Sequence, residues 1–146
     1  MNPKILREEW DAFDVKTDNG IKIEVKSAAY IQSWEQRKYS KITFSIKKVR
    51  HWDTNVGLSR GEAKRQADVY VFCLLTTKDQ TIINPLKMEQ WEFYVLPTHK
   101  LDNYNRSQTT ISLSSLQKLT EPVIYSELKI KLRTATRNNA IIIYIS

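Results

Sequence analysis

A short alternating stretch near the start of the chain constrains the fold most strongly. From Phe13 to Lys26, apolar residues fall mostly at odd positions and polar residues at even positions, on both sides of Asp18-Asn19-Gly20. Alternation with a period of two residues is typical of a strand with one buried and one exposed face. Gly20 supplies the left-handed backbone that a tight turn needs. The stretch therefore predicts a β-hairpin with a three-residue turn.

The length of this turn decides which side chains face each other. A three-residue turn sets Asp14 across from Glu24, whereas a two-residue turn would set polar positions against apolar ones. Lys26 then lies two residues along, on the same face as Glu24. Two carboxylates about 5 Å apart repel each other by roughly 3 kcal/mol at an effective dielectric constant near 20. A positive charge is therefore expected there, either Lys26 or a divalent cation held by oxygen ligands.

The composition indicates one ordinary folded domain. The chain has 146 residues, and no Gly/Ser-rich or Pro-rich linker divides it, so a single domain over 1–146 is expected. No run of apolar residues is long enough to span a bilayer, and Met1-Asn2-Pro3-Lys4 leads into no signal-peptide core. We expect no membrane partner and a cytoplasmic location. Cys73 stands alone in an apolar run and is expected to be a small buried hydrophobe.

The charge balance favours a polyanionic partner. The chain has 23 Lys and Arg against 16 Asp and Glu, a net charge of +7, although solubility alone accounts for such an excess in many proteins. The segments 30–41 and 47–50 mix aromatic and cationic residues, which suits phosphate contact and base stacking. Equally, Trp34 and Trp52 would anchor these loops to the core. Gln36 and Lys38 are the candidate nucleic-acid contacts, and 64–66 is a second basic patch or a solvated helix face.

The remaining pattern predicts an α/β domain. Strands are expected over 41–46, 67–76 and 91–96, with the apolar run 67–76 buried on both faces as the central strand. An exposed basic loop is expected over 47–58, and Ser59 with Glu62 predicts a capped helix reaching Gln66. Beyond Pro97 come a brief strand over 110–113, a helix capped by Ser114 and Gln117, a second helix from Ser126, and a strand-prone end over 140–146.

Asp14, nine intervening residues and then Glu24-x-Lys26 resemble the PD-(D/E)xK core of the restriction-endonuclease-like superfamily of magnesium-dependent nucleases. The resemblance covers roughly residues 10 to 96, with a hairpin bearing the acids, a segment leaving the sheet, and then an apolar strand. Small bacterial domains of this superfamily with an Ile-Glu-Val-Lys-Ser strand are particularly similar. The resemblance implies a three-layer α/β core with a mixed sheet of four to five strands and flanking helices. The alternative without catalysis is an exposed strand face, on which the Glu-Lys pair contributes at most about 1 kcal/mol to stability.

The resemblance also implies a chemistry and leaves alternatives open. Asp14, Glu24 and the backbone carbonyl of Val25 would hold Mg²⁺ or Mn²⁺, and Lys26 would orient the attacking water or stabilise developing charge. Carboxylate ligands without a His or Cys cluster argue against zinc. DNA is the expected substrate, and RNA is not excluded. A catalytically inactive member that binds nucleic acid or protein is the runner-up, and a structural subunit completed by another chain is a third hypothesis.

One departure from the superfamily concerns the start of the chain. Its members commonly carry a helix before the first core strand, whereas only Met1 to Glu9 precede the expected strand here. This departure predicts either a shortened relative or a sheet face covered by a second copy in a homodimer or by a partner chain.

Overall fold

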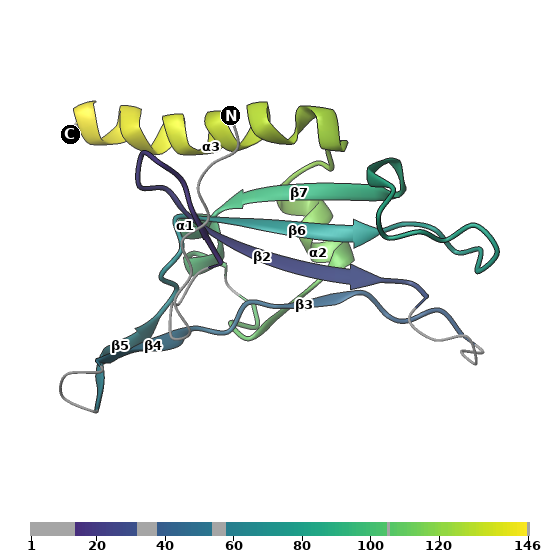
Figure 1. The fold of residues 1–146 in the computed structure, drawn as a ribbon. Coiled ribbons are helices and arrows are strands. Elements are labelled where there is room, and N and C mark those ends of the chain that lie inside the picture. Colours follow the sequence, from purple (N-terminus) through teal and green to yellow (C-terminus); the bar gives the residue numbers. More distant parts are fainter. Residues whose placement is uncertain (1–13, 32–37, 54–57, 105, 146) are drawn as a thin grey trace.

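The computed structural model describes residues 14–31, 38–53, 58–104 and 106–145, and for 49–53, 58–63 and 137–145 it describes the backbone alone. The elements follow the chain in this order (Figure 1): β1 Val15–Lys16, β2 Lys22–Ala29, β3 Thr43–Ser45, β4 Val49–Asp53, β5 Leu58–Lys64, β6 Val69–Leu75, the 3-10 helix η1 Met88–Gln90, β7 Trp91–Pro97, α1 Thr98–Asp102, β8 Thr110–Ser112, α2 Leu113–Leu119 and α3 Tyr125–Ile145.

A four-stranded mixed sheet forms the middle of the domain. Its strand order is β1-β2-β6-β7, with β2 and β6 parallel and the other two pairings antiparallel. The strand β6 is flanked on both sides and almost fully buried, as its unbroken apolar sequence predicts. Two small sheets, β3 with β8 and β4 with β5, complete the described strands. The predicted mixed sheet is confirmed.

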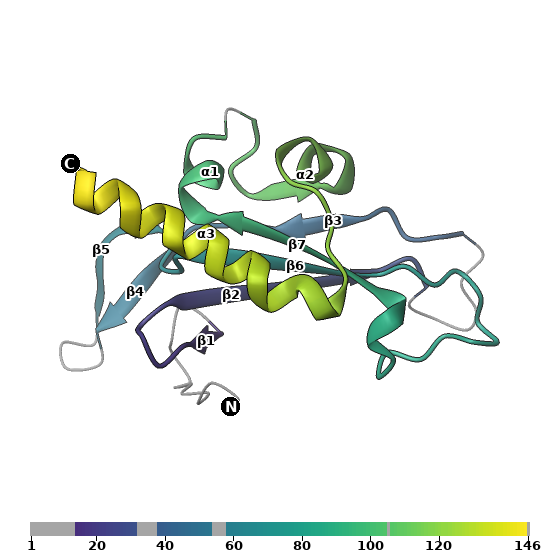
Figure 2. The same ribbon diagram turned by 90° about the horizontal axis from the view of Figure 1, so that it is seen from above.

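Helices and small strands cover the two faces of this sheet, which gives three layers. On one face α3 packs through Leu128, Leu132 and Ala135 against alternate residues of β6 and β7, and Figure 2 shows this helix lying across the strands. The other face carries a second core cluster, to which β3, β8, α1 and α2 contribute Phe44, Ile111, Leu101 and Leu116. The period of two residues in β6 and β7 thus divides one sheet between two apolar cores. The three-layer α/β prediction is confirmed.

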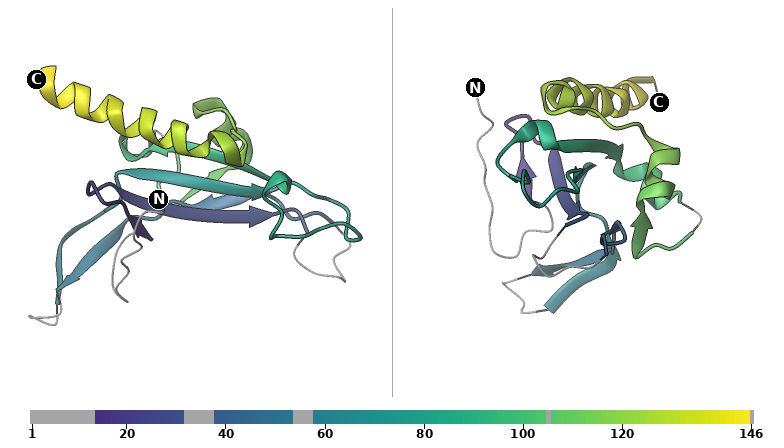
Figure 3. Two further views of the ribbon diagram at one scale, coloured as in Figure 1. Left: turned by 45° about the horizontal axis from the view of Figure 1, so that its top comes forward. Right: turned by 90° about the vertical axis from the view of Figure 1, so that its right-hand side faces the viewer.

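Two predictions between residues 47 and 66 are wrong. The expected loop over 47–58 contains β4, and the expected helix from Ser59 is β5, which pairs with β4 in an antiparallel hairpin that projects away from the main sheet (Figure 3). The Ser59 and Glu62 spacing imitates a capping box, but cross-strand backbone pairing from Val49↔Lys64 to Asp53↔Leu58 takes these residues.

The predicted strand at the C-terminal end is also wrong, because 140–145 continues α3. Three smaller details of the predicted strands and helices differ as well. The segment predicted to leave the sheet after the hairpin begins later than expected, because β2 runs on to Ala29. The short strand β3 pairs with β8 outside the main sheet. Ser112 caps α2 by accepting a 3.3 Å hydrogen bond from the Ser115 N–H, in place of Ser114.

The expectations for Met1 to Glu9 and for a first strand near Trp10 lie outside the described residues. Among the residues that the structure does describe, no helix combines the length and the apolar character needed to cross a membrane.

Candidate active site

The β1–β2 hairpin has the predicted turn. Val15 pairs with Ile23 and Lys16 with Lys22. Backbone hydrogen bonds of 2.9 Å from Thr17 N to Ile21 O and from Gly20 N to Thr17 O close a turn of three residues. Gly20 has φ +86°, the left-handed conformation that the sequence requires there. The register prediction is confirmed, and its extension by one residue places Asp14 beside Glu24.

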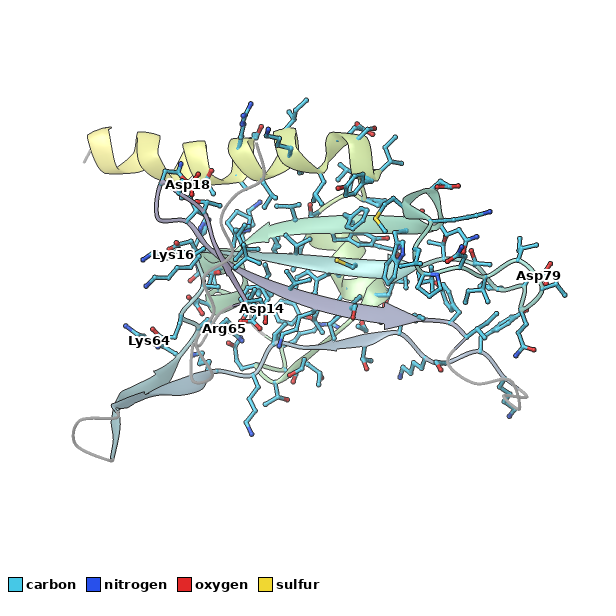
Figure 4. All side chains as sticks on the ribbon, viewed as in Figure 1. Asp14, Lys16, Asp18, Lys64, Arg65 and Asp79 are labelled. Carbon is cyan, nitrogen blue, oxygen red and sulfur yellow. The ribbon has the colours of Figure 1, made fainter. Side chains whose placement is uncertain are left out.

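Asp14 is fixed to β2 by its own side chain. Its Oδ2 atom accepts a 2.8 Å hydrogen bond from the backbone N–H of Val25. Among the described residues, the pairing of β1 (Val15–Lys16) with β2 ends at Ile23, and the Asp14 side chain extends the contact to Val25. The Val25 carbonyl points to the same edge as its N–H, since a strand residue exchanges both bonds with one neighbour. Figure 4 shows Asp14 where the hairpin meets the sheet.

Glu24 and Lys26 form an ion pair on one face of β2. Lys26 Nζ lies 3.3 Å from Glu24 Oε1, and the side chains are 29% and 16% exposed, respectively. Burial raises the pKa of Glu24 above its usual 4.5, the charge of Lys26 lowers it, and the nearby Asp14 carboxylate raises it again. The net direction is upward, so burial and Asp14 together outweigh the attraction of Lys26. The two carboxylates therefore share one electrostatic site.

Tyr70 forms the buried wall of this site. It pairs with Glu24 across the parallel strands and is 4% exposed. Burial, followed by the negative charge of Glu24, raises the pKa of Tyr70 to about 12, while the Arg65 charge lowers it. The hydroxyl consequently stays protonated at neutral pH, where it remains a hydrogen-bond donor.

Arg65 corrects the predicted surface patch over 64–66. Its side chain is buried, with Nε donating to Ile46 O at 2.9 Å, one terminal nitrogen 2.7 Å from Asp102 Oδ1, and further bonds to Gln108. Lys64, one residue earlier, is exposed. Sequence reasoning missed this role because the partners of Arg65 lie 19 to 43 residues away.

Asp14 and Glu24 carry oxygen atoms of the kind that hard divalent cations bind. The site offers two carboxylates and, at the same edge, a backbone carbonyl, which is the chemistry that Mg²⁺ selects. Among the described residues, no group of three or more His, Cys, Asp and Glu side chains gathers in a way that could hold a metal. Any metal here would thus need the carbonyl and solvent or substrate oxygens besides the two acids. His99 is exposed on α1, away from this hairpin in sequence.

The structure does not place the predicted nucleic-acid contacts Gln36 and Lys38 beside Asp14 and Glu24. Gln36 lies outside the described residues. Lys38 is exposed and lines a cavity of about 910 Å³, together with residues of the loop that follows β6.

The fold and the cluster together define a class: a basic three-layer α/β domain with two acids and a lysine gathered at one strand of its sheet. The family model of bacteriophage T4 endonuclease IV matches residues 7–115, which include the whole hairpin and β6, and the chain belongs to this family of nucleases. Searches among curated proteins and among solved structures gave no match.

Proposed function

We propose that the chain is a metal-dependent endonuclease that hydrolyses phosphodiester bonds of DNA at a site formed by Asp14, Glu24 and Lys26. The observation that carries the proposal is the hairpin register, with the Asp14 carboxylate bonded to Val25 N–H beside the Glu24–Lys26 pair. Family membership supports nucleic acid as the substrate. RNA stays open as a second substrate. Hydrolysis joins a water oxygen to phosphorus, breaks one ester P–O bond and gives the leaving oxygen a proton.

Asp14, Glu24 and the Val25 carbonyl would hold Mg²⁺ or Mn²⁺. A bound divalent ion polarises the phosphoryl oxygen and lowers the pKa of water. Each acid has a separate task in the protein itself. The hydrogen bond from the Val25 N–H holds one Asp14 oxygen and so orients this carboxylate beside Glu24. Burial raises the pKa of Glu24 and the nearby Asp14 carboxylate raises it further, so a cation held by both acids would offset these costs.

Lys26 is the proposed electrostatic stabiliser. Its ammonium group is paired with Glu24 at 3.3 Å, and a divalent cation would compete with it for the same carboxylate. Released from that pair, Nζ would donate to a phosphate oxygen or to the attacking water. Donors preorganised toward developing negative charge typically supply about 3 to 4 kcal/mol of transition-state stabilisation. These roles of Asp14, Glu24 and Lys26 are the ones that the resemblance to the PD-(D/E)xK superfamily implies, and we propose that the site is of this type.

The experiment that tests this function measures cleavage of circular duplex and circular single-stranded DNA with MgCl₂, with MnCl₂ and with EDTA. We expect cutting only with a divalent metal. Asp14→Asn and Glu24→Gln should abolish cutting while circular dichroism stays unchanged. Asp18→Asn is the matched control, because Asp18 is an exposed acid at the tip of the same hairpin.

The second candidate is a catalytically inactive member that binds nucleic acid or protein through the same scaffold. The Glu24–Lys26 pair favours it, because Lys26 partly neutralises the acids without any metal. Binding of DNA in EDTA with a steep salt dependence, and no cleavage under any divalent metal, would select this candidate.

We also propose association through the sheet face that carries Val25, in a homodimer or with a partner chain. Val25 is 40% exposed on the edge half of this face, whereas Ile23 two residues earlier is buried. Light scattering of the wild type and of Val25→Lys measures this association.

A further inference from the structure

A cavity lies beyond the C-terminal end of β2. Asp14, Glu24 and Lys26, which we call the acid cluster, lie nearer the start of this strand. It measures about 910 Å³ and is lined by Ile31, Lys38, Tyr39 and the segment 78–81. Figure 4 places Asp79 of this segment and Asp14 at opposite ends of the sheet. Ligand pockets in proteins commonly measure about 300 to 1,000 Å³, so the cavity has room for a nucleotide.

Two tyrosines and a lysine form one wall of this region. Tyr30 and Tyr39 pack edge to face, with ring centroids 6.5 Å apart. Lys78 Nζ lies over both rings, 4.4 Å from the Tyr30 centroid and 5.3 Å from the Tyr39 centroid. Tyr39 is nevertheless 59% exposed, far more than a ring needs for anchoring a loop. An exposed aromatic ring between lysines is suited to a base and its phosphate.

The loop that carries Lys78 is held in place before any ligand arrives. The Gln90 side chain accepts a 2.9 Å bond from Asn84 N–H and donates a 2.9 Å bond to Ile82 O. Asp79 Oδ1 accepts from Thr81 N–H and Thr81 Oγ1, at 2.9 and 2.7 Å. These bonds occupy one oxygen of the acid and fix the turn. The loop next to Lys78 is therefore preorganised, which lowers the entropic cost of binding.

The cavity lies along the same face of β2 as the acid cluster. Ala28 and Tyr30 pack on the cluster that includes Tyr70 and Phe72, which is the face that also carries Glu24 and Lys26 by strand alternation. The four steps along the chain from Lys26 to Tyr30, which directly follows β2, span about 13 Å. At about 3.4 Å or more per nucleotide, this distance corresponds to roughly two to four nucleotides.

We propose that this cavity binds one unpaired nucleotide of the substrate strand, two to four positions from the bond that is cut. The base lies against Tyr39, and its phosphate lies between Lys38 and Lys78. The proposal rests on the proposed function for the position of the cut, whereas the binding site itself needs no catalysis.

The test is photo-crosslinking in EDTA, so that no metal-dependent cleavage intervenes. The probe is a single-stranded DNA oligonucleotide with 5-iododeoxyuridine, and the crosslinked peptide is identified by mass spectrometry. We expect crosslinks on the peptides that contain Tyr39 or Tyr30, and about tenfold weaker binding for Tyr39→Ala and for Lys78→Ala. Tyr125→Ala and Lys129→Ala are matched controls, since both side chains are exposed on α3 over the opposite sheet face.

A second arm links the cavity to the cut. The cleavage position is first mapped on a labelled oligonucleotide, and each flanking nucleotide is then replaced in turn by an abasic one. One abasic position, two to four nucleotides from the cut, should slow the wild type about tenfold and leave Tyr39→Ala unaffected. Crosslinks outside these peptides, or variants that bind as the wild type does, overturn the cavity proposal even if DNA is cut. Crosslinks at Tyr39 without any cleavage support the cavity and reject the endonuclease.

Discussion

The backbone N–H of Val25 donates a 2.8 Å hydrogen bond to Asp14 Oδ2, and this bond ties the first acid of the site to the strand that carries the second. The carboxylate thereby takes the place of a backbone partner at the edge of β2. Asp14 is thus both a structural group and a candidate ligand, and these two roles respond differently to substitution.

Asp14→Ala and Asp14→Asn separate the two roles. The alanine removes the acceptor of Val25 N–H and should lower the free energy of unfolding by about 0.5 to 1.5 kcal/mol, whereas the asparagine retains an acceptor oxygen and should cost less. Both should lose the rise in melting temperature that Mg²⁺ gives the wild type. Calorimetry with and without MgCl₂ measures both effects. An unchanged magnesium response in Asp14→Asn would remove Asp14 from the ligand set.

Glu24→Gln should stabilise the metal-free protein at neutral pH. The pKa of Glu24 is raised in the folded state, so the folded protein binds its proton more tightly than the unfolded chain does. The corresponding stability is present below pH 4.5 and is lost as the pH rises through the raised pKa. The melting temperature of Glu24→Gln should therefore exceed that of the wild type above this window, and the two should converge below it. Glu121→Gln, an exposed acid, should show no such divergence. A wild type more stable than Glu24→Gln at pH 7 would contradict the burial argument.

Gly20 tests the turn that sets the register. Its φ of +86° disfavours any side chain, although nothing lies within 4 Å of a Cβ built there. Gly20→Ala should therefore lower the free energy of unfolding by about 1 kcal/mol through backbone strain alone, and Gly20→Asn by less, because Asn tolerates the left-handed region. Urea denaturation gives both values. Equal stability of all three proteins would mean that the turn does not impose this conformation.

Arg65 should matter for stability far more than its neighbour. Arg65→Ala leaves Ile46 O, Asp102 and Gln108 without their donor, and we expect a loss of about 2 to 3 kcal/mol, since Asp102 is partly hydrated. Lys64→Ala, at an exposed position, should change the stability by less than about 0.5 kcal/mol. Thermal unfolding compares the two variants. Similar losses of stability for Arg65→Ala and Lys64→Ala would contradict the buried role of Arg65 and support the predicted surface patch over 64–66.

The sequence predicts the hairpin and β6 because local patterns determine both. Alternation and Gly20 specify the register, and an apolar run specifies a strand buried on two faces. Prediction from the sequence fails where contacts between residues far apart in the chain determine the structure. The β4–β5 pairing overrides a local capping signal at Ser59, and Arg65 finds its partners on α1 and the following loop. The Ile-rich end over 140–145 favours a strand by propensity, yet it extends a helix already formed from Tyr125. The cavity beside Tyr39 combines Ile31, Lys38 and Tyr39 with the segment 78–81, which no local pattern joins.

The most direct test of the proposed site is the rate at which wild type and Lys26→Ala cut the same labelled DNA with saturating MgCl₂, at protein concentrations where both bind the DNA equally. Lys129→Ala, which alters an exposed lysine of α3, is the control. We predict metal-dependent cutting by the wild type and the control, and at least about a hundredfold slower cutting by Lys26→Ala. Equal rates for Lys26→Ala and the wild type would contradict the Asp14, Glu24 and Lys26 site.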